Sequence, residues 1–171
     1  LSAFHQLKKG ESHPLITEDD FEYLIDFFET NNDSENIQFA YDIALSIYPF
    51  SSSLLIRKAE WLTDYKKFGQ ALKLLDQLQE IDPNQIDAVF LKSDIFIEQG
   101  KHKEAAHYLE SYVDKFDHVE RTDILLELSE IYDELEEFEK VYHTLKRVLE
   151  IDSSNEDALL RICFWAEVNG M

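Results

Sequence analysis

The sequence predicts an all-α fold, a solenoid built from antiparallel helix pairs. The 171 residues include only 4 glycines and 3 prolines, too few for a many-turned β-sandwich or a disordered linker protein. The helix formers leucine, glutamate, lysine, alanine and glutamine dominate the composition instead. Several columns of residues also recur at one period. With 44% hydrophobic residues, the chain is long enough to bury a substantial core.

The repeat becomes visible when the sequence is shifted along itself. A shift of 34 residues places Pro49 over Pro83 and Ala59 over Ser93, and a shift of 36 places Ser93 over Ser129. Several unrelated columns share this period, so chance is a poor explanation. We expect units to begin near Glu18, Ser52, Ile86, Thr122 and Glu156, the last unit being incomplete.

Residues 1–17, "LSAFHQLKKGESHPLIT", do not fit the repeat. They could be a leader or the remnant of a preceding helix, and the residues leave both interpretations open. The array itself is expected over residues 18–171.

The first helix of each unit is indicated by apolar residues at i, i+3 or i+4, and i+7, as in Phe21, Leu24 and Phe28. Capping residues precede it: Thr17 before an acidic first turn, and Ser153 in a capping-box pattern with Glu156. Short polar breaks such as "NNDSEN" and "EQGKHK" end these helices.

The second helices are expected to begin near Glu35, Gln70, Glu104 and Glu139. The third unit is two residues longer than its neighbours, around "DKFDHVE". We therefore expect its second helix or its exit loop to be extended.

These columns resemble the tetratricopeptide repeat, whose pattern is W-x2-L-G-x2-Y, then A-x3-F, then a proline. The first part reads Phe21-x2-Leu24-Ile25-x2-Phe28 in the first unit and Leu55-x2-Lys58-Ala59-x2-Leu62 in the second. Every unit lacks the tryptophan, and the proline survives only at Pro49 and Pro83. The resemblance covers nearly the whole chain and implies a right-handed superhelical solenoid that acts as a protein-interaction scaffold.

One column of this pattern holds small residues because two helices packed 8–10 Å apart leave little room at closest approach. Ala59, Ser93, Ser129 and Cys163 fit it, whereas Ile25 does not. Overpacking at Ile25 would cost roughly 1–3 kcal/mol unless the first unit packs differently.

The net charge of -20 argues against nucleic acid and anionic membranes as partners and suits cationic ones. No apolar run reaches the roughly 18 residues that a membrane helix needs. The single cysteine excludes an internal disulfide and weakly favours a reducing, cytoplasmic location.

No catalytic constellation is visible. His102 and His107 are five residues apart, a poor spacing for two metal ligands on one helix face. His102 also shares the column of Phe68 and Phe138, so packing explains it better. Cys163 occupies the small position, which favours a structural role. We therefore expect no enzyme, no metal site and no cofactor.

The resemblance implies that the first helices line a concave face where partner peptides bind. The expected inner stripe consists of Glu22, Asp26, Ile56, Glu60, Asp64, Phe90, Asp94, Glu98, Leu126, Glu130 and Glu134. One of its columns is apolar from Ile56 onward, and the next is acidic in four consecutive units.

The family's clamp for acidic C-termini is disfavoured, because Asp26 and Glu60 stand where that clamp has asparagine and Arg57 is an isolated basic residue. The hypothesis is a groove for a segment carrying basic and apolar side chains. The alternative is that these acids only promote solubility, since carboxylates about 10 Å apart in water repel by only roughly 0.4 kcal/mol.

The last helix, "ALLRICFWAEV", is apolar on several sides. Leu160, Phe164, Trp165 and Val168 cannot all be buried against one preceding unit. Either further repeats follow in the natural protein, which we favour, or this edge meets a second copy. The alternative function is therefore a structural or oligomerising segment of a larger repeat protein with no separate ligand.

Overall fold

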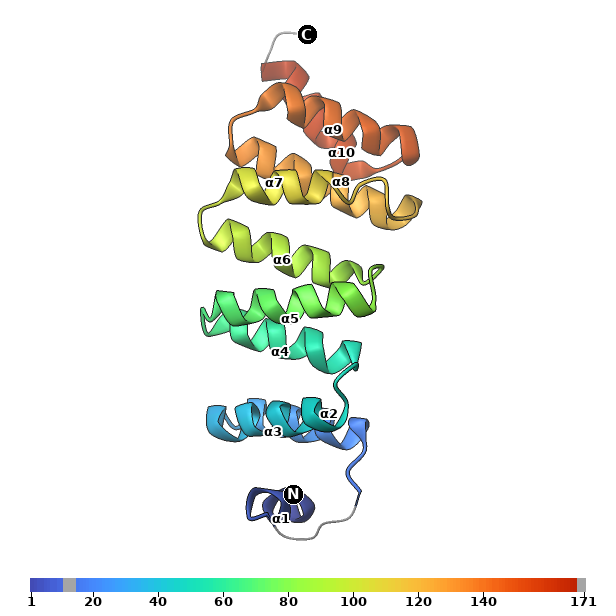
Figure 1. Ribbon diagram of the computed structural model, residues 1–171. Coiled ribbons are helices and arrows are strands. Elements are labelled where there is room, and N and C mark those ends of the chain that lie inside the picture. Colours follow the sequence, from blue (N-terminus) through green and yellow to red (C-terminus); the bar gives the residue numbers. More distant parts are fainter. Residues whose placement is uncertain (11–14, 169–171) are drawn as a thin grey trace. The chain divides into compact units, whose positions relative to one another are not determined.

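The computed structural model describes residues 1–10 and 15–168, apart from the side chains of residues 166 and 168. Within these residues it contains ten α-helices and no strand, which confirms the all-α prediction (Figure 1). The helices are α1 (Ser2–Lys8), α2 (Glu18–Thr30), α3 (Ser34–Ile47), α4 (Ser52–Asp64), α5 (Phe68–Ile81), α6 (Ile86–Glu98), α7 (His102–Glu110), α8 (His118–Glu134), α9 (Phe138–Ile151) and α10 (Glu156–Val168).

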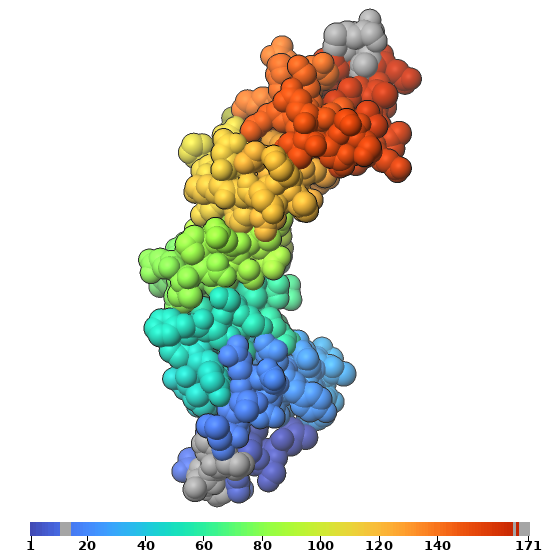
Figure 2. All heavy atoms as spheres, turned by 90° about the vertical axis from the view of Figure 1, so that its right-hand side faces the viewer, coloured from blue at the N-terminus to red at the C-terminus, as the bar shows by residue number. Residues whose placement is uncertain are grey.

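The chain divides into two compact units, Leu1–Pro83 and Asn84–Met171, and each is described by itself. The first contains α1 to α5 and the second α6 to α10. Side chains fill the space between the ribbons of neighbouring helices within each unit (Figure 2).

Side-chain caps precede the first helices α2 and α4, whereas the first helix α6 begins at Ile86 without one. The Thr17 side chain accepts a hydrogen bond from the Asp20 N–H, and the Asp20 carboxylate accepts one from the Thr17 N–H. These bonds hold the pKa of Asp20 below its usual value. Ser51 accepts from the Leu54 N–H at 3.1 Å and caps α4 in the same way.

The turn inside each helix pair repeats in detail. The second residue after the end of α2, α4, α6 and α8 has positive φ, at Asn32, Lys66, Gly100 and Glu136. At Lys66 its N–H donates to the Thr63 carbonyl at 2.8 Å, and the next N–H, of Lys67, donates to the Leu62 carbonyl at 2.8 Å. This bond pair defines the Schellman motif, and the other three turns show the same pair. The four connecting segments differ in sequence but adopt the same type of turn.

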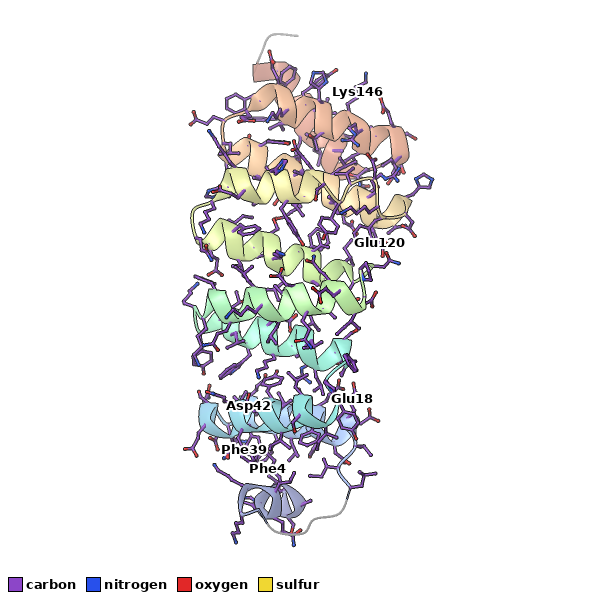
Figure 3. All side chains as sticks on the ribbon, viewed as in Figure 1. Phe4, Glu18, Phe39, Asp42, Glu120 and Lys146 are labelled. Atoms are coloured by element: carbon purple, nitrogen blue, oxygen red, sulfur yellow. The ribbon has the colours of Figure 1, made fainter. Side chains whose placement is uncertain are left out.

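The residues ahead of the first repeat include a packed helix. The Phe4 side chain of α1 is 1% exposed, and its ring centroid lies 4.9 Å from that of Phe28 and 5.5 Å from that of Phe39. Figure 3 shows Phe4 and Phe39 directed toward each other from α1 and α3. Lys8 Nζ donates to Glu35 Oε1 at 2.8 Å. Aromatic burial and one ion pair thus hold α1 against α2 and α3.

The two extra residues of the third unit lie in its exit loop and not in its second helix. Its second helix, α7, has only 9 residues, so it is shortened, and the connection 111–117 takes up the extra length. Val113 and Phe116 in this connection are buried, and the Arg121 side chain donates to both of their carbonyl oxygens. The Asp117 carboxylate caps α8 by accepting from the Val119 and Glu120 N–H groups, so α8 begins at His118, before the expected unit start at Thr122.

The small column is buried where a second helix covers it. Ala59, Ser93 and Ser129 are fully buried, and Ile25 is too. The first unit therefore accommodates the larger Ile25 side chain within its core. Cys163 is exposed, so the expected structural role is wrong for the described chain, because no described helix covers that face of α10.

Candidate functional site

In the first unit, the expected inner stripe is partly neutralised. Glu22 accepts a hydrogen bond from the Ser53 hydroxyl, and Asp26 forms an ion pair with Arg57. Ile56 is buried at 8% exposure, so it contributes packing rather than ligand contacts. Glu60 and Asp64 lie exposed on α4.

In the second unit, the stripe lies on α6 and α8. Phe90 and Leu126 are half-buried, and the four acidic residues Asp94, Glu98, Glu130 and Glu134 are exposed. Two of these carboxylates have basic neighbours: Arg161 Nη1 lies 3.8 Å from Glu130 Oε1, and His102 Nε2 lies 3.0 Å from Glu134 Oε2. The contact with Glu134 shows that His102 is not held by packing alone.

An arginine recurs at one position of the repeat and neutralises the acidic column. Arg57 is the sixth residue of α4 and pairs with Asp26 of the preceding first helix. The sequence suggested that Arg57 is an isolated basic residue, and the ion pair shows that this is wrong. Arg161 is the sixth residue of α10 and lies beside Glu130 of α8, the corresponding acid. One structural rule thus holds at both places.

At the same position of α8 the repeat has Glu127 instead of arginine. Glu127 lies close enough to Asp94 for their negative charges to interact. Burial, followed by the charges of Asp94, Glu130 and Glu134, raises the pKa of Glu127 above its ordinary value of 4.5. Burial and the nearby Glu98 likewise raise the pKa of Asp94. We call Asp94, Glu98, Glu127, Glu130 and Glu134 the acidic cluster.

A cleft of about 450 Å³, here called the polar cleft, lies among α2, α3 and α4 of the first unit. It is lined by Glu29, Asn32, Ile37, Tyr41, Arg57, Glu60, Trp61, Asp64 and Tyr65. Arg57 Nη2 lies 3.3 Å from Glu29 Oε2, and the Tyr41 hydroxyl donates to Glu29 Oε1 at 3.4 Å. Burial, and then the charge of Glu29, raises the pKa of Tyr41, so this hydroxyl remains a donor.

A second cleft of about 470 Å³, here called the apolar cleft, lies among α8, α9 and α10 of the second unit. It is lined by Asp133, Phe138, Val141, Leu160, Arg161, Phe164 and Trp165. Its tryptophan ring stacks on Tyr142 at a centroid distance of 4.8 Å. The side chain of Val168, expected to join Leu160 and Phe164 in this patch, lies outside the described residues.

The two clefts occupy equivalent positions of the repeat. Arg57 and Trp61 are the sixth and tenth residues of α4, and Arg161 and Trp165 are the sixth and tenth residues of α10. The main difference is the ninth position of the first helix, which is Glu60 in the polar cleft and Phe164 in the apolar one. The repeat therefore builds the same kind of cleft twice, with different chemistry.

Comparison with known proteins shows which family model and which solved structures this repeat resembles. Residues 62–121 match the family model described as tetratricopeptide repeat. A tetratricopeptide repeat protein from Parabacteroides merdae ATCC 43184 is 14% identical with a TM-score of 0.70, over 90% of this chain and 60% of that one. MamA from Desulfovibrio magneticus RS-1 is 14% identical with a TM-score of 0.64, over 91% and 88% of the two chains. YrrB, described as a TPR protein with an unusual peptide-binding site, is 19% identical with a TM-score of 0.57, over 77% and 67%.

Residues 62–121 of this chain belong to the tetratricopeptide-repeat family. The family and the helical-repeat fold expected from the residue columns are thereby confirmed. A search of curated proteins gave no match. Tetratricopeptide-repeat proteins are protein-interaction scaffolds in general, and that coarse function applies here.

The described part of the tetratricopeptide-repeat chain has no helix long and apolar enough to cross a membrane. Residues 1–10 and 15–168 also contain no group of three or more histidine, cysteine, aspartate or glutamate side chains suited to a metal ion.

The sequence analysis missed several cleft residues of this tetratricopeptide-repeat protein, among them Glu29, Trp61 and Trp165. A signal for them exists in the segments "IRKAEW" and "LRICFW", which align arginine with arginine and tryptophan with tryptophan. Trp61 and Trp165 lie outside the family's own tryptophan position, which Phe21 and Leu55 occupy in the first two units.

Proposed function

We propose that this protein is an interaction scaffold whose second unit binds a protein segment carrying basic and apolar side chains along the acidic cluster. The proposal is finer than the general scaffold function, and one observation carries it. The repeat neutralises its acidic column with arginine at Arg57 and Arg161, has the uncharged Leu91 at this position of α6, and has Glu127 beside Asp94 in α8.

Such a substitution is unfavourable for folding, since two like charges lie together where the fold elsewhere places an ion pair. A cationic side chain of a partner can supply the missing positive charge from outside. The half-buried Phe90 and Leu126 lie on the same two helices and offer apolar contacts. The described peptide-binding site of YrrB supports the expectation that a fold of this kind binds an extended segment.

The proposal is tested by giving the repeat the arginine that it lacks. The variant Glu127→Arg places a guanidinium near Asp94, as Arg57 is placed near Asp26. The probe is a short fluorescent peptide in which lysine alternates with leucine, and binding is measured by anisotropy at rising salt. We expect affinity for the normal protein to fall with salt, and Glu127→Arg to weaken binding about tenfold or more.

The matched control is Glu150→Arg, which makes the same charge change at an exposed position of α9. It should weaken binding far less than Glu127→Arg does. The proposal is wrong if binding ignores salt, or if the two variants weaken it equally.

A second candidate function, association between copies of the chain, is favoured by the exposed apolar residues of α10. Leu160 is 71% exposed and Phe164 is 69% exposed, and both line the apolar cleft. Large apolar side chains clustered at one surface commonly mark an interaction site.

A further inference from the structure

We propose that the polar cleft of the first unit is a binding site for one cationic side chain, a lysine or an arginine, of a protein partner. The inference rests on the proposed function in that the cation belongs to a protein segment. The polar cleft lies in the first unit and the acidic cluster in the second, and they share no residue. An experiment can therefore exclude one of the two sites without excluding the other.

The first argument is the charge of the cleft lining. The lining includes three carboxylates, those of Glu29, Glu60 and Asp64, and one guanidinium, that of Arg57, while the ammonium of Lys67 lies 4.9 Å from the ring centroid of the lining residue Trp61. Arg57 is also paired with Asp26, which is not among the lining residues, so its positive charge is shared with a further acid. The cleft therefore has an excess of negative charge, and a cation entering it is attracted.

The second argument is the aromatic wall. The ring centroids of Trp61 and Tyr65 lie 4.9 Å apart, and those of Trp61 and Tyr41 lie 6.2 Å apart. The faces of such rings attract ammonium and guanidinium groups. The chain itself gives a precedent, because Lys67 Nζ lies 4.9 Å from the Trp61 centroid and 5.9 Å from that of Tyr65.

The third argument is an unused hydrogen-bond donor. Trp61 lines the cleft and is 6% exposed, and its indole N–H has no hydrogen-bond partner within the described parts of the chain. A buried donor of this kind is normally paired, and leaving it without an acceptor is unfavourable. The indole nitrogen is itself buried, so a main-chain carbonyl of a bound segment reaches it only if the neighbouring side chains move.

The apolar cleft of the second unit shows which positions decide the specificity. It retains the arginine and the tryptophan of the polar cleft but has Phe164 in place of Glu60. The carboxylates of Glu60 and Asp64, rather than the arginine–tryptophan pair, are therefore the charged features that distinguish the cleft for a cation from the apolar cleft.

The test uses single blocked amino acids, which are too small to span the acidic cluster. The probes are the N-acetyl, N-methylamide derivatives of lysine and arginine, with the norleucine derivative as the uncharged analogue. The protein carries Trp165→Phe, so Trp61 is the one remaining tryptophan, and its indole N–H resonance is followed by NMR. We expect a saturable shift with the lysine or the arginine derivative and none with norleucine.

The variant Glu60→Gln with Asp64→Asn should weaken binding of the cationic probes about tenfold. Its control, Asp19→Asn with Glu80→Gln, removes two exposed carboxylates of the first unit that lie outside the cleft and should leave binding unchanged. Thermal melts followed by circular dichroism establish that the variants fold. No saturable shift with either cation, an equal response to norleucine, or equal weakening in both double variants would overturn the proposal.

Discussion

The small position of the repeat illustrates how a single hydroxyl affects packing. Ser129 donates its hydroxyl hydrogen to the Leu126 carbonyl at 2.6 Å, whereas the Ser93 hydroxyl is buried and has no partner among the described residues. Ala59 fills the same position in the second repeat. The site therefore needs a small side chain, and the hydroxyl of Ser93 is unfavourable there.

We predict that Ser93→Ala stabilises the protein by about 1 kcal/mol, because it removes a buried polar group that makes no hydrogen bond. Urea unfolding measures this change. The matched variant Ser129→Ala loses a hydrogen bond and should be destabilising. A Ser93→Ala variant that is less stable than the normal protein would contradict the prediction.

The acidic cluster also has a pH dependence of defined sign. The folded-state pKa values of Asp94 and Glu127 are raised above 3.8 and 4.5, so the folded state binds protons more readily than the unfolded state. Stability from these two groups therefore decreases as pH rises from their unfolded values through their raised values, and their repulsion is complete at neutral pH.

We predict that Glu127→Gln stabilises the protein at neutral pH and that this gain shrinks as the pH is lowered toward 4.5, the ordinary pKa of the side chain. Thermal melts over a pH series measure it. Asp20 and Asp152 have lowered pKa values and lose their contribution only at more acidic pH, so they do not obscure this window. A gain that is constant with pH would show that charge is not its cause.

At the scale of the elements, the four Schellman turns fix the geometry of each helix pair. Their left-handed residue is glycine only at position 100, and Asn32, Lys66 and Glu136 adopt the same conformation with a side chain attached. A side chain in this region costs roughly 1–2 kcal/mol relative to glycine, partly offset by the entropy that glycine loses on folding.

Glu136→Gly and Gly100→Ala should therefore change stability in opposite directions, each by about 1 kcal/mol. A Cβ atom added at Gly100 has no heavy atom within 4 Å, so the loss there is conformational and not a clash. Chemical unfolding of both variants checks the pair of signs. Destabilisation by Glu136→Gly would mean that its side chain contributes more than its backbone conformation costs.

The elements also show what a sequence can predict. The residue columns predict first helices from Glu18, Ser52, Ile86 and Glu156, and α2, α4, α6 and α10 begin at those residues. They do so because apolar spacing and caps act locally. The start of α8 is missed although a local signal exists: the Asp117 side chain caps the helix by accepting hydrogen bonds from the Val119 and Glu120 N–H groups.

The candidate site was less predictable because its contacts join different helices. The acidic column is readable from the spacing, but its neutralisation by Arg57 depends on the packing of successive first helices. The polar cleft needs side chains from three helices to meet, so Glu29 and Tyr65 are assigned to it only from the coordinates.

At the scale of the whole molecule, a chain with net charge -20 has one end of its second unit that is strongly apolar. Leu159, Leu160 and Phe164 are all exposed on α10, although the equivalent of Leu159 in the second repeat, Leu55, is 1% exposed. Covering this surface would bury large apolar side chains, while the overall charge opposes contact between other parts of two copies.

We predict that the chain associates with itself as its concentration rises and that added salt strengthens the association by screening the charge. Analytical ultracentrifugation measures it, and Phe164→Glu should shift the protein toward monomer. The control Phe50→Glu alters an exposed aromatic residue of the first unit. A monomer at every concentration would remove α10 as a contact between copies.

The two clefts have a consequence for how such arrays diversify. Glu60 and Phe164 lie exposed on their helices, so exchanging them leaves the buried positions of the fold untouched. A duplicated helix pair can then bind a different class of side chain after a single amino-acid substitution, with little loss of stability. Among arrays that arise by such duplications, we expect the position of Glu60 and Phe164 in the first helix to vary most, while the buried positions stay constant.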